Sequence, residues 1–142
     1  MPAAFRLQVA TPERVVLTEE ITSLIVPGAA GYLGVKARHA PLVAELQIGR
    51  MWLRRTDGRE VNYAIEGGIL EVSGDGALVL ADCAEAPEEV DIARAEAALE
   101  RAKRRLSAAL DTEEPEIDVT RAQLSLARAA NRLLVAARYR AM

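Results

Sequence analysis

The alternation of apolar and polar residues divides the chain into two parts with different periods. Between Phe5 and about Asp82, short segments alternate with a period of two, the pattern of half-buried β-strands. These segments cover residues 5–9, 21–26, 42–46, 51–53, 61–65, 69–72 and 77–80. Turn residues such as Pro27-Gly28 and Gly67-Gly68 separate them at close intervals. Many short strands of this kind predict an antiparallel β-sandwich or barrel as a first domain over residues 1–87.

After Pro87 the pattern changes to that of helices. Residues through Leu110 are rich in strong helix formers, and the following apolar residues recur at spacings of three and four: Ile92, Ala95, Leu99, Ala102 and Leu106. Pro115 interrupts the pattern, and Asp118 is predicted to cap a second helix that runs to about Tyr139. Its predicted inward positions are Val119, Ala122, Leu126, Ala129, Ala130 and Leu133. The short connection predicts an antiparallel two-helix hairpin as a second domain over residues 88–142, and the fold class is therefore α+β.

Alanine dominates both predicted helix stripes. Alanine lets two helix axes approach closely but buries little apolar area per residue, so we expect the hairpin to be weakly held. A weakly held element can be switched between two arrangements by a ligand that binds one of them better. The alternative is a hairpin that stays docked permanently.

Composition and charge exclude several classes of function. The chain is 51% hydrophobic and 27% charged, which is typical of a folded globular protein. Residues 1–87 carry eight Lys/Arg against eleven Asp/Glu, and residues 88–142 carry ten of each, which argues against nucleic-acid binding. The only cysteine, Cys83, and the only histidine, His39, predict neither an internal disulfide nor a metal cluster. Without a long apolar run or a signal peptide, we expect membrane association only through a partner.

Several motifs resemble those of one protein family. They are Gly31-Tyr32-Leu33-Gly34-Val35, His39-Ala40-Pro41-Leu42, Gly67-Gly68-Ile69-Leu70-Glu71-Val72, Val79-Leu80-Ala81 and Val90-Asp91-Ile92-Ala93-Arg94-Ala95. In order and spacing the chain resembles the epsilon subunit of bacterial F-type ATP synthases over nearly its full length. The resemblance implies a non-catalytic central-stalk subunit that binds the gamma subunit and the ring of c subunits through its sandwich.

The resemblance also implies how the two domains are used. The C-terminal helices would inhibit ATP hydrolysis by reaching the alpha/beta catalytic head in an extended state. The complex would hold the subunit peripherally on the cytoplasmic side of the bacterial plasma (inner) membrane. Tyr32 and His39 would be partner-binding residues. In the family, the first sandwich loop tends to carry acids and Pro-Gly precedes the histidine, whereas this chain has Ala30, Tyr32, Ala37 and Arg38. Tyr32 is therefore expected to supply an aromatic contact in place of charge.

Two pairs of arginines are the candidate ligand-binding residues of the hairpin. Arg94 and Arg101 are seven residues apart on the first helix, and Arg128 and Arg132 are four apart on the second, so each pair shares a face. Folding the chain about a midpoint near Glu114 places Arg101 level with Arg128. Arg94 then lies near the level of Arg132, and all four fall within about 10 Å along the axis. Guanidinium groups match phosphate oxygens bidentately. The pattern suits a triphosphate, and together with the resemblance to the family it makes ATP the expected regulatory ligand. No cofactor is expected to be required.

The segment from Val90 to Ala95 resembles the ATP-binding motif of the family, and the resemblance adds Glu85 and Asp91 to the candidate site. These carboxylates would orient Arg94 or accept hydrogen bonds from the adenine amino group. Because the chain lacks a Gly-rich phosphate loop, the site would sense ATP and not hydrolyse it. Whether Mg²⁺ accompanies the nucleotide stays open. The alternative is that the arginines are solvated surface residues paired with neighbours such as Glu96 and Glu100.

Other residues and functions have simpler interpretations. We interpret His39 as a loop or packing residue, Cys83 as a packing residue, and Trp52 as a core or intersubunit residue. Glu66 and Glu71 are most simply outward-facing strand residues. The second candidate function is a free-standing nucleotide-sensing module without a synthase partner. An enzyme built on the sandwich ranks third, because no catalytic constellation is visible.

Overall fold

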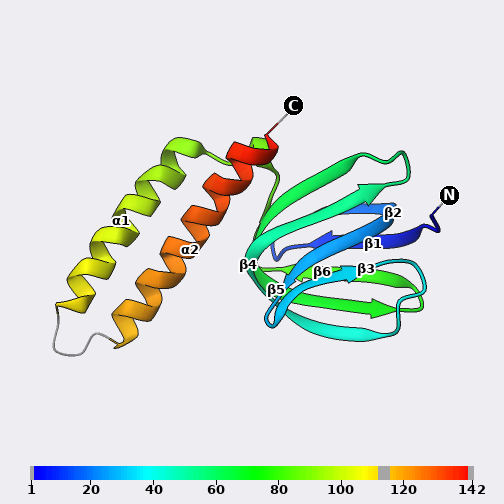
Figure 1. Ribbon diagram of the computed structural model, residues 1–142, viewed down its shortest axis with the longest axis horizontal. Helices are drawn as coiled ribbons and strands as arrows, with labels where there is room; N and C mark the ends of the chain where they lie inside the picture. The colour runs from blue at the N-terminus through cyan, green and yellow to red at the C-terminus, as the bar shows by residue number, and fades with distance from the viewer. Residues whose placement is uncertain (1, 112–115, 141–142) are drawn as a thin grey trace. The chain divides into compact units, whose positions relative to one another are not determined.

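A computed structural model describes residues 2–111 and 116–140, with the side chains within these ranges except those of residues 116–118. The chain divides into two compact units, residues 1–86 and residues 87–142. The first unit is built from strands and the second from helices (Figure 1). No helix in the described ranges is both long and apolar enough to cross a membrane.

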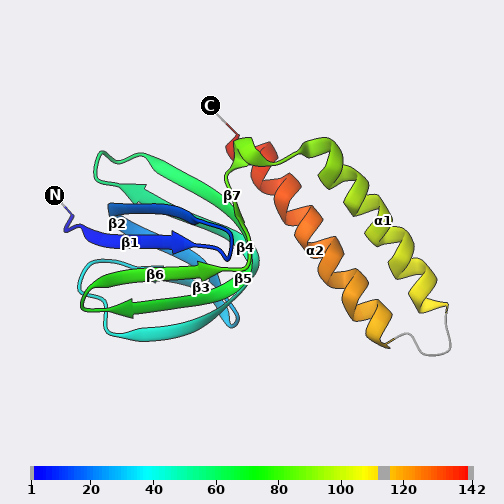
Figure 2. The ribbon, with the colours of Figure 1, turned by 180° about the vertical axis from the view of Figure 1, so that it is seen from behind.

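The strands of the first unit form a closed ring. They are β1 (Phe5–Ala10), β2 (Val15–Gly28), β3 (Gly31–Val35), β4 (Leu42–Arg55), β5 (Glu60–Ser73), β6 (Gly76–Ala81) and β7 (Ala84–Glu85). The order β1-β6-β5-β4-β2 closes because β1 also pairs with β2, while β3 extends from β2 and β7 from β5. Every pairing is antiparallel except that of β1 with β6, which run side by side in the same direction (Figure 2). The predicted fold class is confirmed, with this one parallel pairing in addition.

β2 is longer than the predicted segment 21–26, and two other strands each join segments that the sequence predicted as separate strands. The segments 42–46 and 51–53 belong to the single strand β4, and the segments 61–65 and 69–72 belong to β5. The prediction of a turn at Gly67-Gly68 was wrong, because both glycines lie inside β5 with φ values of 97° and 133°. A Cβ atom at Gly68 would collide with the carbonyl oxygen of Leu80. The glycines therefore let β5 bend and pass close to β6. Glycine is favoured at such bends as well as at turns, so the residue type alone did not distinguish the two.

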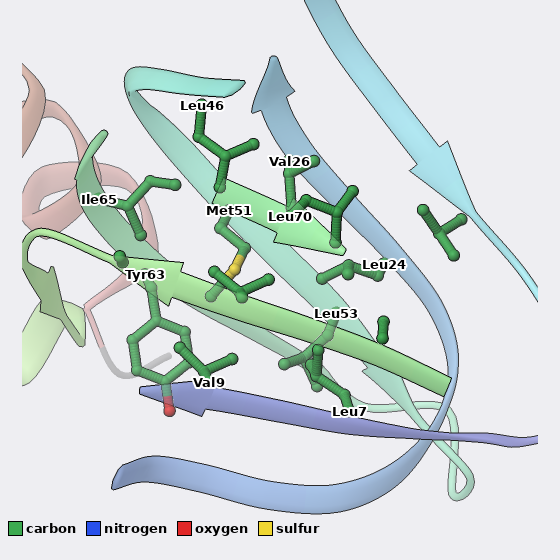
Figure 3. Close-up of a cluster of buried hydrophobic side chains, with 14 of the residues drawn as sticks. Leu7, Val9, Leu24, Val26, Leu46, Met51, Leu53, Tyr63, Ile65 and Leu70 are labelled. Carbon is green, nitrogen blue, oxygen red and sulfur yellow. The ribbon is translucent and has the colours of Figure 1, made fainter. Parts of the chain in front are cut away.

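Apolar side chains from all seven strands form the core of the first unit. Figure 3 labels ten of these side chains, all of them buried: Leu7, Val9, Leu24, Val26, Leu46, Met51, Leu53, Tyr63, Ile65 and Leu70. They alternate with outward residues along their strands, as the period of two requires. Full burial of each large aliphatic side chain stabilises the fold by about 1.5–3 kcal/mol. The first unit thus has a core of its own.

The second unit is a helical hairpin. A 3₁₀ turn η1 (Pro87–Glu89) leads into α1 (Ile92–Leu110), and α2 (Glu116–Tyr139) returns beside it (Figures 1 and 2). Asp91 caps α1, since its Oδ1 accepts a hydrogen bond from the backbone N–H of Arg94 at 3.1 Å. The predicted cap of the second helix was wrong, because α2 begins at Glu116 and places Asp118 in its first turn. Acidic residues suit both positions, so the sequence did not separate them.

Alanines seven residues apart form the buried row of each helix. In α1 they are Ala95, Ala102 and Ala109, and in α2 they are Ala122, Ala129 and Ala136. Five other predicted inward residues are half-buried beside these rows: Leu99, Leu106, Val119, Leu126 and Leu133. Two inward predictions were wrong, because Ile92 and Ala130 are exposed. Ala130 follows buried Ala129 by about 100° around the helix, and only one of the two can face the partner.

The register of the hairpin follows from its base. Ala95 and Ala136 lie in one apolar cluster with Val90 and the half-buried Leu133. Because the helices are antiparallel and both buried rows repeat every seven residues, Ala102 then lies opposite Ala129, and Ala109 opposite Ala122. Each layer of this interface joins two alanines, which bury little area.

Candidate functional site

The arginines of α1 lie on one flank of the hairpin. Arg94 and Arg101 each precede a buried alanine, Ala95 and Ala102, by one residue, so both project about 100° from the interface. Both side chains are exposed. Neither forms an ion pair or a side-chain hydrogen bond with any residue that the structure describes. Two positive charges on one flank are thus available to an anion.

The arginines of α2 lie on the same flank. Arg128 precedes buried Ala129 by one residue and Arg132 precedes buried Ala136 by four, and both are half-buried. In an antiparallel pair, positions that precede the buried row on either helix face the same side. All four predicted arginines therefore share one flank.

Their levels along the hairpin follow from the alanine register. Arg132 lies opposite Leu99, and Arg128 lies opposite Lys103. The backbone positions of Arg101, Arg128 and Arg132 therefore fall within about 6 Å along the axis. Arg94 lies farther toward the base, about 7.5 Å from the level of Arg132. The sequence placed Arg94 level with Arg132; the register places Arg132 with Arg101 and Arg128 instead. Three of the four arginines thus start from similar levels along the hairpin, and Arg94 starts nearer its base.

The two predicted carboxylates have different positions. Asp91 is held as the cap of α1 by its bond to the backbone of Arg94, which fixes the first turn from which Arg94 projects. Glu85 is half-buried on β7 in the first unit, where a ligand atom of Glu85 lies within 4.8 Å of one from Glu66 and one from Cys83. Asp91 therefore belongs to the hairpin and Glu85 to the strand unit.

Tyr32 belongs to a cluster of aromatic and cationic side chains on the outer face of the ring, the Tyr32 cluster (Tyr32, Arg50, Trp52 and Asn62). Tyr32 is 55% exposed, and its ring centroid lies 5.8 Å from that of Trp52. The Arg50 guanidinium stacks 3.8 Å above the Trp52 ring, and its Nε donates to Asn62 Oδ1 at 2.8 Å. The Tyr32 hydroxyl accepts a hydrogen bond from the backbone N–H of Arg50 at 3.3 Å.

Sequence reasoning missed that Arg50 belongs to this cluster. Arg50 and Trp52 are two residues apart on β4, so a period of two places them on one face, and this spacing was the available signal. Gly49 permits the arrangement, because a Cβ there would lie 2.6 Å from Pro27 Cβ and 3.1 Å from the Tyr32 hydroxyl. The hydrogen bonds hold the exposed aromatic surface in one geometry.

His39 lies exposed in the loop between β3 and β4. Its Nδ1 is 2.7 Å from the carbonyl oxygen of Ala40, and its backbone N–H donates to Lys36 at 3.2 Å. Arg38, directly before it, has a φ of 63°, in the left-handed region that few residues other than glycine adopt. The interpretation of His39 as a loop residue is thus confirmed.

A second outer surface is apolar. Val43 on β4, Ile69 on β5 and Leu80 on β6 are 72%, 48% and 49% exposed, and Ile69 and Leu80 are directly paired. Glu45 pairs with Ile69 and Glu71 with Val43, so two carboxylates border these residues. We call this surface the apolar patch (Val43, Ile69 and Leu80). Large exposed apolar residues on neighbouring strands are typical of contact surfaces.

Comparisons with known proteins cover both units. Residues 4–87 match the family described as "ATP synthase, Delta/Epsilon chain, beta-sandwich domain", and residues 88–137 match "ATP synthase, Delta/Epsilon chain, long alpha-helix domain". A relative from Moorella thermoacetica named "ATP synthase epsilon chain" is 49% identical over 104 residues, 73% of this chain and 78% of that protein. One of the same name from Solibacter usitatus is 47% identical over 80% of this chain and 84% of that protein.

A solved structure shares the fold. A chain in the cryo-EM structure of Euglena gracilis mitochondrial ATP synthase, OSCP/F1/c-ring, superposes with a TM-score of 0.79 at 24% identity, covering 96% of this chain and 82% of that chain. The same order of strand unit and helical unit is therefore kept at low identity. From the matches across both units, the chain belongs to the ATP synthase delta/epsilon chain family, among its epsilon chains.

Proposed function

We propose that the chain is the non-catalytic epsilon-type subunit of the central stalk of a proton-translocating ATP synthase, which couples the catalytic head to the c-ring. The observation that carries this proposal is the match of both units to one family, since the two matched domains meet between residues 87 and 88. The relatives named as epsilon chains support it. The complex would hold the chain peripherally at the cytoplasmic side of the bacterial plasma membrane.

The strand unit offers surfaces for the gamma subunit and the c-ring. The apolar patch presents large aliphatic side chains to solvent, and the Tyr32 cluster presents a fixed aromatic and cationic surface. Apolar and aromatic groups provide most of the binding energy of such contacts. We therefore assign stalk binding to these two surfaces of the first unit.

An acidic substitution in the apolar patch tests this assignment. Ile69→Asp should reduce co-purification with the gamma subunit by at least tenfold, because binding would bury an unpaired charge. The matched control is Val15→Asp on β2, where a valine that is 58% exposed lies outside the patch. Equal co-purification of both variants with gamma would contradict the assignment. Saturable ATP binding by a chain that never co-purifies with gamma would support the free-standing sensing module instead.

The hairpin would regulate the complex by sensing ATP. Four arginines share one flank of the hairpin, two on each helix. Their positive charges repel one another unless an anion binds among them. A triphosphate would relieve this repulsion and bind through bidentate hydrogen bonds. ATP would thus favour the folded hairpin, and its loss would free α2 to reach the catalytic head and inhibit hydrolysis.

Calorimetric titration of the full chain with ATP tests the sensing role. Saturable binding should be lost in an Arg94→Ala, Arg128→Ala double variant, because both helices lose a phosphate ligand. Arg104→Ala is the matched control, since exposed Arg104 follows Ala102 by about 200° and faces away from α2. No binding by the unmodified chain at millimolar ATP would exclude sensing and leave the stalk role intact.

A further inference from the structure

Arg140 closes the base of the hairpin. It directly follows α2, and its guanidinium reaches back to the turn before α1, more than fifty residues earlier in the chain. Its Nε and Nη2 donate to the carbonyl oxygen of Pro87 at 3.2 and 2.9 Å, and Nη2 also donates to the carbonyl oxygen of Val90 at 2.6 Å. One side chain thus joins the end of α2 to the start of the helical unit.

The acceptors of these bonds are carbonyl groups that lie ahead of α1. Pro87 belongs to η1 and Val90 precedes the cap residue Asp91, so neither carbonyl takes part in the α-helix. The only described backbone donor to Pro87 is the N–H of Val90, at a long 3.4 Å. Glu88, Glu89 and Asp91 stand in the same short segment, and their charges favour a cation there. The turn is therefore suited to an arginine.

Arginine can donate to two carbonyl oxygens at once in a geometry that lysine does not provide. The planar fork directs separate N–H groups at two carbonyl oxygens, whereas an ammonium group is a single point donor on a flexible stem. Hydrogen bonds from a charged donor are also stronger than those between neutral groups. The two-carbonyl contact thus depends on the shape of the side chain as well as on its charge.

The position of Arg140 makes its bonds important for the hairpin. Val90, whose carbonyl it binds, also packs in the apolar cluster with Ala95 and Ala136. Beyond this cluster, the buried rows of the interface consist of alanine layers, which contribute little burial each. The polar contact and the cluster adjoin one another at the base, where α2 must leave α1 if the helices separate.

We infer that Arg140 is a latch that holds α2 in the folded hairpin and must release Pro87 and Val90 before the helices separate. The consequence for regulation rests on the proposed function, in which the folded and separated hairpins have different effects on the complex. The latch itself does not depend on that function, because it concerns only the hairpin of the free chain.

Amide hydrogen exchange of the full chain tests the latch. Two of the variants, Arg140→Gln and Arg138→Gln, each remove one positive charge. Arg140→Gln should speed amide exchange about tenfold in residues 92–96 and 133–139, while the strands of the first unit exchange as before. Arg138→Gln is the control, since exposed Arg138 makes no side-chain hydrogen bond or ion pair to a described residue. The amide exchange rate of Arg140→Lys should fall between those of Arg140→Gln and the unmodified chain. Lysine keeps the positive charge but loses the planar guanidinium group.

Two outcomes separate the latch from the proposed function. If Arg140→Gln exchanges at the same rate as Arg138→Gln, the latch is overturned, whatever the complex does. If Arg140→Gln loosens the hairpin tenfold and ATP hydrolysis by the assembled complex stays unchanged, the latch stands and the regulatory role of the hairpin fails. Unchanged strand exchange in every variant excludes general unfolding as the cause.

Discussion

Arginine has three different physical roles in this chain, and its immediate partners decide which. Arg50 stacks on Trp52 and is fixed by Asn62, so it is part of a surface. Arg140 binds backbone carbonyls and joins distant segments. The exposed Arg94 and Arg101 have no side-chain hydrogen bond or ion pair within the described part of the chain, and their charges are available to a ligand. Residue type alone does not distinguish these roles, because the partners determine them.

The turn between β4 and β5 gives a residue-scale prediction about pH. Asp57 Oδ1 accepts from the backbone N–H of Arg59 at 2.9 Å, and Oδ2 accepts from Arg59 Nε at 2.8 Å. The backbone hydrogen bond first, and then the side-chain bond, lower the pKa of Asp57 below its ordinary value. Because the folded pKa is the lower one, the turn is stabilised above the pKa of the unfolded chain and loses this stabilisation as pH falls through the folded pKa.

An NMR titration of the Asp57 carboxyl carbon measures this shift. Its midpoint should lie below the ordinary range for aspartate, about 3.9 in model peptides. Arg59→Ala should raise the midpoint only partway, because the backbone donor remains. Arg54→Ala removes a cation of the same strand end that bonds to Glu60, and it should leave the midpoint nearly in place. A midpoint at the ordinary value in the unmodified chain would show that the bonds from Arg59 do not lower the pKa of Asp57.

At the scale of elements, β5 owes its length to two glycines that let it bend. β5 pairs with β4 along most of its length, with β7 at Ala64 and Ile65, and with β6 from Gly68 onward. A straight strand does not meet all of these partners, and Gly67-Gly68 marks the point where the pairing changes. A Gly-Gly pair signals a turn and a bend alike, so local sequence predicted the elements on either side but not their continuity.

Substitution of Gly68 tests this role of the bend. Gly68→Ala should destabilise the strand unit by about 2–4 kcal/mol, because alanine is strained at a φ of 133° and its Cβ meets the carbonyl oxygen of Leu80. Gly34→Ala is the control, since an added Cβ at Gly34 on β3 meets nothing within 4 Å. Denaturant unfolding followed by Trp52 fluorescence measures both variants. A loss of stability equal to that of Gly34→Ala would rule out the close approach as the reason for Gly68.

The whole molecule shows which features a sequence pattern predicts and which it does not. Alternation located the strand cores, and the change of period located the hairpin, because both patterns reflect burial within one element. The parallel pairing of β1 with β6 was not predictable, since neither strand's pattern states which distant strand lies beside it. In the candidate site, the spacing of Arg94 and Arg101 predicted a shared face, whereas Arg140 was missed because its acceptors are backbone carbonyls without a residue signature.

Separation of the chain into two units leads to a prediction about the complex. The strand unit has its own core and carries both the apolar patch and the Tyr32 cluster, so it should keep its place on the stalk when the hairpin is removed. The hairpin carries balanced charge, ten basic and ten acidic residues in 88–142, and all four candidate ATP ligands among its arginines. The proposed function thereby assigns attachment to the strand unit and regulation to the hairpin.

Removal of residues 88–142 should therefore raise ATP hydrolysis by the assembled complex while the truncated chain still co-purifies with gamma. We expect a several-fold increase, because the truncated chain has no α2 with which to block rotation in the hydrolysis direction. The ratio of truncated chain to gamma must equal that of the full chain, since a complex that has lost the subunit would also change its rate. If the stoichiometry is preserved and hydrolysis is no faster than in the intact complex, the hairpin does not inhibit, and the flank arginines have another role.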